Sequence, residues 1–152
     1  MAVEFGYEWE LVGLGKLALA ALLGGAIGWG RERLHRPAGL RTYMLVTLGS
    51  ALFTLLSLEA FGPVADPSRI ASQIIVGIGF LGAGTLIRTG EWVRGLTTAA
   101  GLWTVAAIGM AVGVGAYLLA VSATVLVLLV LEGIRRVERK QAPPSPPPGT
   151  QG

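Results

Sequence analysis

The chain has 152 residues, of which 53% are hydrophobic and 14% are charged, and its formal net charge is +3. A soluble domain of this composition would have too little polar surface to cover itself, so a water-soluble globular protein is excluded. Cysteine is absent, which excludes disulfides, thiolate metal sites and cysteine nucleophiles.

Four uncharged runs hold nearly all of the apolar residues, and the charged residues fall between them. The runs are residues 17–30, 42–58, 70–87 and 95–131. Each run approaches or exceeds the roughly 20 residues that a helix needs to cross about 30 Å of hydrocarbon. They are apolar on all sides, whereas strands of a membrane barrel alternate apolar and polar residues, so the predicted spans are helices.

The fourth run, 95–131, is too long for one span. Its 37 residues would form a helix of about 55 Å, well beyond the thickness of the hydrocarbon core. Gly109, Gly113 and Gly115 mark a tight turn within it. The predicted spans are therefore 11–29, 40–61, 70–87, 96–111 and 115–131.

Basic residues orient these five spans, because loops rich in Lys and Arg stay in the cytoplasm. With an external N-terminus, 10 of the 12 basic residues are cytoplasmic, and only Lys16 and Arg69 lie outside. The sequence thus predicts an all-α, polytopic membrane protein with a cytoplasmic C-terminus. Because membrane topology accounts for the excess of basic residues, we expect no nucleic-acid partner.

Three segments follow from this division. Residues 1–10 form a short external segment, residues 11–132 form the transmembrane domain, and residues 133–152 form a cytoplasmic tail. The tail is basic at first and then rich in proline, with no apolar anchor, so we expect its end to be disordered.

A glycine-rich stretch lies inside the third predicted span. Gly77, Gly79 and Gly82 match the dinucleotide-binding pattern G-x-G-x-x-G, but that pattern works as a strand-to-helix turn in a soluble sheet. We expect instead that glycines let helix backbones approach closely. A locally unwound helix lining a site is the alternative. The candidate packing glycines are Gly24, Gly28, Gly77, Gly79, Gly82 and Gly84, with Gly109 and Gly113 near the turn.

The first cytoplasmic loop, 31–41, holds four arginines, His35 and Glu32. Its guanidiniums could bind an anion or a partner carboxylate, or the loop could be solvated and touch anionic lipid. We expect Glu32 to pair with Arg41 or Arg94, because a carboxylate among arginines should find a partner. We expect no metal at His35, since the arginines repel cations.

The second cytoplasmic loop, 88–94, leads into a span that begins near Thr97 and Thr98. Either threonine can cap that helix, and Arg94 with the free amides of the helix N-terminus could hold an anionic group. A cap plus a membrane anchor is the alternative. Together the candidates for anion or partner binding are Glu32, Arg33, Arg41, Thr42, Arg94, Thr97 and Thr98.

The outward end offers few groups for chemistry. Glu59 and Asp66 are the candidates for a metal site, with Mg²⁺ as the conceivable ion, although two carboxylates at a rim are usually just solvated. One histidine, no cysteine and carboxylates mostly at helix ends cannot assemble a nucleophile with an adjacent base, so we do not expect an enzyme.

Two stretches of the chain carry a resemblance to a known family. GGAIGWGRERLHRPAGLRTYMLVTLGSALFTLLS, residues 24–57, and RIASQIIVGIGFLGAGTLIRTGEWVRGLTTAAGLWTVAAIGMAVGVGAYLLA, residues 69–120, contain AGLRT, GFLGAG and GLTTAA in this order. Over roughly residues 11–132 the chain resembles the MgtC/SapB family of bacterial inner-membrane proteins. The family pattern falls on Glu32, Arg33, Ala38, Gly39, Leu40, Arg41, Thr42, Ser50, Gly77, Gly79, Gly82, Gly84, Gly95, Thr97 and Thr98. Members often have an acid-arginine-glutamate run after the first span, whereas here Arg31 precedes Glu32 and Arg33.

The resemblance implies about five spans in the bacterial inner membrane. It also implies a link to growth under magnesium limitation and to survival of pathogens inside macrophages. Some members are described as inhibiting the proton-translocating ATP synthase, which implies another membrane protein complex as a partner. Many members carry a soluble C-terminal domain of ACT-like fold, and we expect this chain to be a short form without it.

A regulatory or interaction protein in the lipid bilayer is therefore the expected function. We also expect it to self-associate into a homo-oligomer through its glycine faces. The alternative is a transporter or channel for magnesium or another ion, which would need oxygen ligands within or at the mouth of the membrane.

Overall fold

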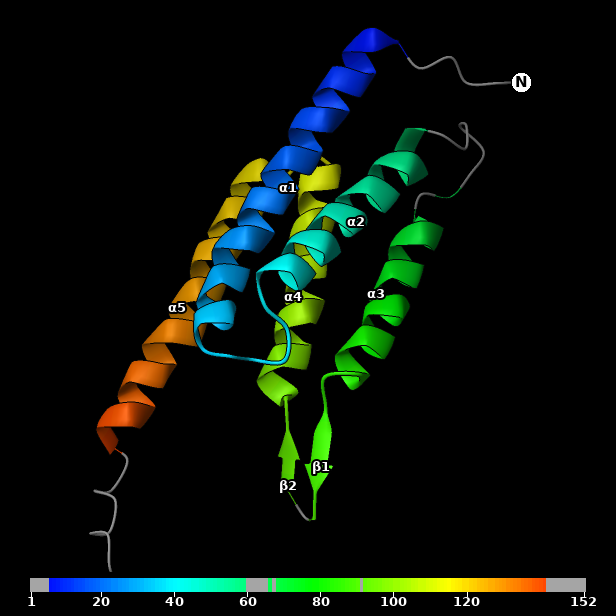
Figure 1. The fold of residues 1–152 in the computed structure, drawn as a ribbon. Helices are drawn as coiled ribbons and strands as arrows, with labels where there is room; N and C mark the ends of the chain where they lie inside the picture. The colour runs from blue at the N-terminus through cyan, green and yellow to red at the C-terminus, as the bar shows by residue number, and fades with distance from the viewer. Residues whose placement is uncertain (1–5, 60–65, 67, 91, 142–152) are drawn as a thin grey trace, which may run out of the picture.

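The computed structural model describes residues 6–59, 66, 68–90 and 92–141, and within these ranges the chain forms five helices and one β-hairpin (Figure 1). The helices are α1 (Tyr7–Arg33), α2 (Leu40–Glu59), α3 (Ser68–Ala83), α4 (Leu96–Gly113) and α5 (Tyr117–Gln141). Helices α1, α2 and α4 are long and apolar enough to cross a membrane, while α3 and the apolar part of α5 are shorter. The predicted all-α membrane fold is confirmed.

Helix ends differ from the predicted spans by several residues. Helix α1 extends beyond 11–29 in both directions, and α5 continues past residue 131 to Gln141, because helical hydrogen bonds continue into the polar layer outside the hydrocarbon. The expected end of the second span, 60–61, and the end of the tail, 142–152, lie outside the described residues.

The third span is shorter than predicted. Helix α3 ends at Ala83, and the chain then forms strands β1 (Ile87–Thr89) and β2 (Trp92–Arg94), which pair antiparallel with Thr89 opposite Trp92. Gly90 has a positive φ of 62° in the turn, a conformation that glycine adopts without steric cost. The apolar run to residue 87 therefore supplies a strand at its end rather than a last turn of helix.

Helix α2 lies between α1 and α4, and glycines on the two outer helices bring the backbones together. A Cβ atom at Gly28 of α1 would lie 2.8 Å from the Leu40 Cα atom of α2. Gly109 and Gly113 of α4 stand against the other side of α2 in the same way. This is the small-residue packing that joins helices where lipid removes the usual hydrophobic driving force.

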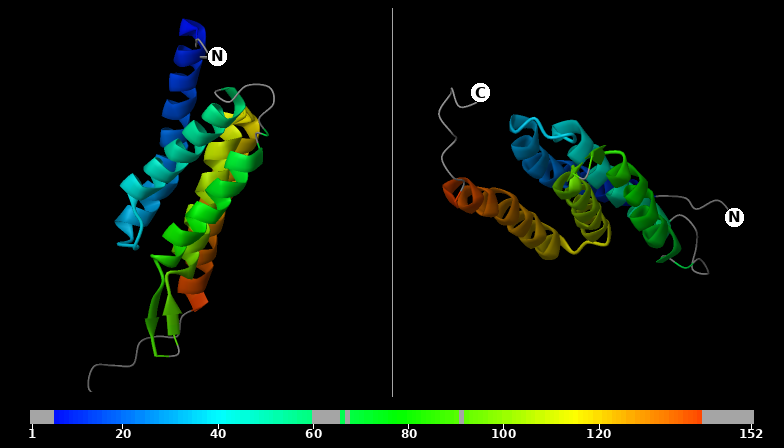
Figure 2. Two further views of the ribbon diagram at one scale, coloured as in Figure 1. Left: turned by 90° about the vertical axis from the view of Figure 1, so that its right-hand side faces the viewer. Right: turned by 90° about the horizontal axis from the view of Figure 1, so that it is seen from below.

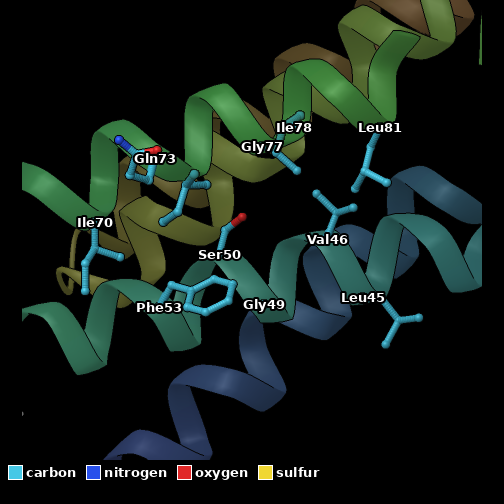
Figure 3. A pocket seen from close by; sticks show the side chains of 11 residues that line it. Leu45, Val46, Gly49, Ser50, Phe53, Ile70, Gln73, Gly77, Ile78 and Leu81 are labelled. Carbon is cyan, nitrogen blue, oxygen red and sulfur yellow. The ribbon is translucent and has the colours of Figure 1, made fainter. Parts of the chain in front are cut away.

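Helix α3 packs less closely against α2. A groove of about 500 Å³ separates the two helices, and Gly49 of α2 and Gly77 of α3 lie along it without side chains to fill it (Figure 3). Its lining is apolar apart from Ser50 and Gln73. Large apolar side chains on the outer surface, such as Phe80 at 82% exposure, suit contact with lipid hydrocarbon rather than water.

The loop between α1 and α2, the β-hairpin and the end of α5 all lie at one end of the molecule (Figures 1 and 2). The first loop and the hairpin, with the helix ends beside them, bring six arginines to this end, which we call the arginine-rich end: Arg31, Arg33, Arg36, Arg41, Arg88 and Arg94. The fold thus joins two charged segments that are about fifty residues apart in the sequence.

Candidate functional site at the arginine-rich end

Arg31 lies inside the helix bundle, although it stands in the last turn of α1. It follows Gly24 and Gly28 at spacings of four and three residues, so all three lie on the face of α1 that packs against α2. Only 5% of Arg31 is exposed. Its chemistry is therefore directed at other helices and not at the surrounding water.

The Arg31 guanidinium contacts the first turn of α4. Its Nη2 atom donates a hydrogen bond to the Thr98 hydroxyl at 2.6 Å, and Thr98 is 1% exposed. The hydroxyl of Tyr43, from α2, lies beside the same guanidinium and against Gly101 of α4. Three helices thus contribute Arg31, Tyr43 and Thr98 to one buried cluster, which we call the buried triad.

Two polar atoms of the buried triad lack partners. Neither Arg31 Nε nor the Tyr43 hydroxyl oxygen makes a hydrogen bond, and both atoms are buried. Most buried polar groups in proteins are satisfied, because an unpaired one costs about 1–3 kcal/mol. The Tyr43 oxygen can accept from the neighbouring guanidinium, but the guanidinium N–H and the tyrosine O–H are both donors, so the cluster still holds more donors than acceptors.

Helix α4 begins without the threonine cap that the sequence suggested. Its N-cap residue is Gly95, with a φ of 97° and no side-chain hydrogen bond to the helix. Thr98 accepts from Arg31 instead, and Thr97 is exposed. The expectation of a threonine cap is therefore wrong, and the N-cap residue supplies no side-chain acceptor to the first-turn amides of α4.

Glu32 has a structural partner different from the expected one. Its Oε2 atom accepts a hydrogen bond from the Leu40 amide at 2.9 Å, and Gly39 leaves room for this carboxylate, because a Cβ atom there would collide with it. Among the described residues Glu32 forms no ion pair with Arg41 or Arg94. It acts as a cap for α2, which gives the AGLRT sequence a local structural reason.

Replacing Glu32 by alanine should lower the free energy of unfolding by about 0.5–2 kcal/mol, because the Leu40 amide loses its acceptor. Denaturant unfolding of the purified protein in detergent measures this. Glu32→Gln keeps an oxygen acceptor at the same position and should lose less. Equal losses in the two variants would contradict a capping role.

The remaining candidates at this end lie on the surface. Arg41, Thr42, Arg94 and Thr97 are exposed, and the guanidinium of Arg33 stacks over the Trp29 ring at 4.9 Å. The structure therefore separates the predicted group into Thr98, which is buried in the triad, Glu32, which caps α2, and surface residues available to a partner.

The glycine candidates differ in what they contact. Gly24 and Gly28 stand against α2, and Gly82 makes ordinary contact with Ala99 of α4. Gly77 and Gly79 have open space where a side chain would be, and Gly84 is close only to its own preceding turn. Within the part of the chain that the structure describes, Gly77 and Gly79 therefore join no pair of helices.

The opposite end holds the two metal candidates. Both the hydroxyl and the amide of Ser68 donate to Asp66 Oδ1, at 2.7 and 2.9 Å, and these bonds hold the pKa of Asp66 below its usual range. Glu59 lies in a hollow of about 280 Å³ that Glu8 and Lys16 also line. Lys16 donates to the Gly113 carbonyl at 3.0 Å, which places a cation at the C-terminal end of α4.

Arg31 and Tyr43 were not among the residues that the sequence singled out for function. Arginines after a span are usually a topology signal, which directs attention away from the one that turns inward. The helical spacing of Arg31 from Gly24 and Gly28 is the signal that could have found it. Tyr43 similarly begins a buried stripe with Thr47, Ser50 and Thr54 along α2.

Comparison with known proteins decides the family. The model of the MgtC family matches residues 17–140, which is most of the chain and includes every helix of the bundle in whole or large part. This chain belongs to the MgtC family. No solved structure matches it.

Several curated members of the MgtC family are similar to this chain. A protein of Escherichia coli strain K12 named "Putative magnesium transporter YhiD" is 47% identical over 124 residues, covering 77% of this chain and 58% of that protein. Protein MgtC of Brucella abortus strain 2308 is 50% identical over 114 residues, covering 75% and 48%. Protein SrpB of Synechococcus elongatus is 40% identical over 153 residues, covering 91% and 84%. This chain thus spans about half the length of the YhiD and MgtC relatives.

Proposed function

We propose that this protein is a regulatory or interaction protein of the bacterial inner membrane that acts through its arginine-rich end, with that end in the cytoplasm. The observation that carries the proposal is the β-hairpin, which projects past the ends of the helices (Figure 1). Trp92 is 79% exposed and Ile87 is 58% exposed on it, and Arg88 and Arg94 are exposed beside them. Exposed aromatic and arginine side chains are typical anchors of protein interfaces.

The biological setting of the proposal comes from the family. The resemblance links members to growth under magnesium limitation, and we propose the same setting for this chain. A membrane protein complex, with the proton-translocating ATP synthase as the candidate, is the proposed partner. We propose no catalytic role, because the residues offer no nucleophile paired with a base.

Magnesium transport is the second candidate, and the name of the YhiD relative favours it. A magnesium path requires oxygen ligands, usually carboxylates, within the membrane or at its mouth. The apolar parts of the five helices contain no Asp or Glu, and this counts against a path through the bundle. Glu59 and Asp66 remain the carboxylates to test at the outer end.

A growth assay separates the two candidates. Cells that lack their own family member receive the wild-type chain or the double variant Trp92→Ser/Arg94→Gln, and growth is measured at limiting magnesium. We expect the hairpin variant to lose the growth benefit. The matched control, Tyr7→Ser/Arg69→Gln, removes an exposed aromatic ring and an exposed arginine from the opposite end and should keep it.

A flux assay tests the alternative, magnesium transport. The purified protein is reconstituted into liposomes that enclose a magnesium-sensitive dye. We expect no flux above that of empty liposomes. Magnesium entry that Glu59→Gln or Asp66→Asn abolishes would overturn the proposal in favour of transport. Full growth of the hairpin variant would also overturn the proposal, because the hairpin would then not be needed.

We also propose that the protein forms a homo-oligomer through α3. The open space at Gly77 and Gly79 would let a helix of a second copy approach closely. Crosslinking in native membranes should yield a dimer or larger species, and Gly79→Leu should reduce it. Recovery of monomer alone from wild type, across a range of protein levels, would contradict this proposal.

A further inference from the structure

The buried triad contains a positive charge without a counter-ion. The Arg31 guanidinium is 5% exposed. Within the described ranges it forms a hydrogen bond with the Thr98 hydroxyl but no ion pair. A buried charge is costly unless it is paired with an opposite charge. The neutral threonine oxygen satisfies part of the guanidinium's hydrogen bonding and leaves its charge uncompensated.

A second positive feature faces the same point. Helix α4 begins at Leu96, and its N-cap residue Gly95 has no side chain that could accept from the first-turn amides. The N-terminus of a helix carries partial positive charge and readily binds anions. Arg31 donates to Thr98 in the first turn of this helix, so the guanidinium lies at the positively charged end of α4.

A third donor completes the arrangement. The Tyr43 hydroxyl is fully buried beside the Arg31 guanidinium, and within the described ranges neither this hydroxyl nor Arg31 Nε makes a hydrogen bond of good geometry. Gly101 provides the space in which that hydroxyl lies, because a Cβ atom there would collide with it. The two groups are an N–H and an O–H, and even if the hydroxyl oxygen accepts from the guanidinium beside it, its own proton still needs an acceptor. The missing partner must therefore be an acceptor with negative charge and several oxygens.

We infer that Arg31, Tyr43 and the first turn of α4 bind a phosphate-type oxyanion, supplied by a lipid headgroup or by free phosphate. A tetrahedral phosphate offers oxygens in several directions, and it suits the planar donors of arginine better than a halide does. Leu96 and Thr97 are exposed on the same turn of α4, so this turn gives the anion a route from the surface. The inference does not depend on the proposed function, since the site would exist equally in a transporter.

Binding to the full chain in detergent tests the inference. Titration calorimetry measures the affinity for inorganic phosphate at constant ionic strength. Native mass spectrometry compares how much phosphatidylglycerol and how much phosphatidylcholine the protein retains. We expect Arg31→Gln to weaken binding by about tenfold or more, because a charge-assisted contact is lost. Tyr43→Phe should weaken it by about threefold, since it removes one neutral hydrogen bond and keeps the ring.

The matched control is Arg69→Gln, which removes the same charge from an exposed position at the opposite end and should leave binding within about twofold of wild type. Tyr43→Phe decides the matter if Arg31→Gln fails to fold. Binding of inorganic phosphate identifies a soluble source, and selective retention of phosphatidylglycerol identifies a lipid headgroup. Equal losses in Arg69→Gln and Arg31→Gln, unchanged binding in Tyr43→Phe, or no binding of either probe by wild type would overturn the inference.

Discussion

Replacing Gly109 by alanine should lower the free energy of unfolding by about 1–3 kcal/mol, because it overpacks the contact between α4 and α2. A Cβ atom at Gly109 would collide with the Thr47 carbonyl oxygen and would lie 3.0 Å from the Ser50 Cβ atom. The first obstacle is backbone, which cannot rotate away as a side chain can. The two helices would have to separate along a line where their backbones approach closely.

The matched control for this variant is Gly77→Ala. Both glycines lie within helices, but an added Cβ atom at Gly77 has no neighbour within 4 Å. Alanine favours a helix over glycine by up to about 1 kcal/mol, so Gly77→Ala should be neutral or stabilising in a monomer. Reversible unfolding in mixed detergent micelles measures both. A Gly109→Ala protein as stable as wild type would contradict the close packing of α2 and α4.

The number and type of the helices could be predicted from sequence because each uncharged run approaches or exceeds the length that a helix needs to cross the hydrocarbon. The uncharged runs therefore located α1, α2, α3 and the split between α4 and α5. The β-hairpin could not be found in this way, since strands of three residues have no measurable periodicity. Ile87 was assigned to a span because apolar residues look the same in a helix and in a short strand.

The site was only partly predictable, because a single sequence does not say which face of a helix meets a neighbour. Gly77 and Gly109 look equally suited to close packing, yet only Gly109 contacts another helix within the described chain. Glu32 was expected to pair with an arginine, but its carboxylate accepts a hydrogen bond from the backbone amide of Leu40, eight residues away. In the sequence Arg31 is one of four arginines in the first loop. In the structure it lies on the same face of α1 as Gly24 and Gly28, and its side chain is buried in the bundle.

Gly95→Ala should be the most damaging change at the start of α4. Gly95 has a φ of 97°, in a region where an L-residue costs about 1–2 kcal/mol. A Cβ atom there would also collide with the Thr85 carbonyl oxygen of the segment that leads into β1. Together the strain and the collision should reduce the free energy of unfolding by about 2–4 kcal/mol.

Gly115→Ala separates the two causes. Gly115 has a similar φ of 84°, but nothing lies within 4 Å of its added Cβ atom. It should lose only the conformational part, about 1–2 kcal/mol, so the difference between the variants reports the collision with Thr85. Hydrogen exchange should accelerate at residues 85–98 in Gly95→Ala alone. If both variants lose the same stability and exchange alike, the hairpin is not held against the start of α4. If they differ as expected, Gly95 fixes the position of the helix end that Arg31 contacts.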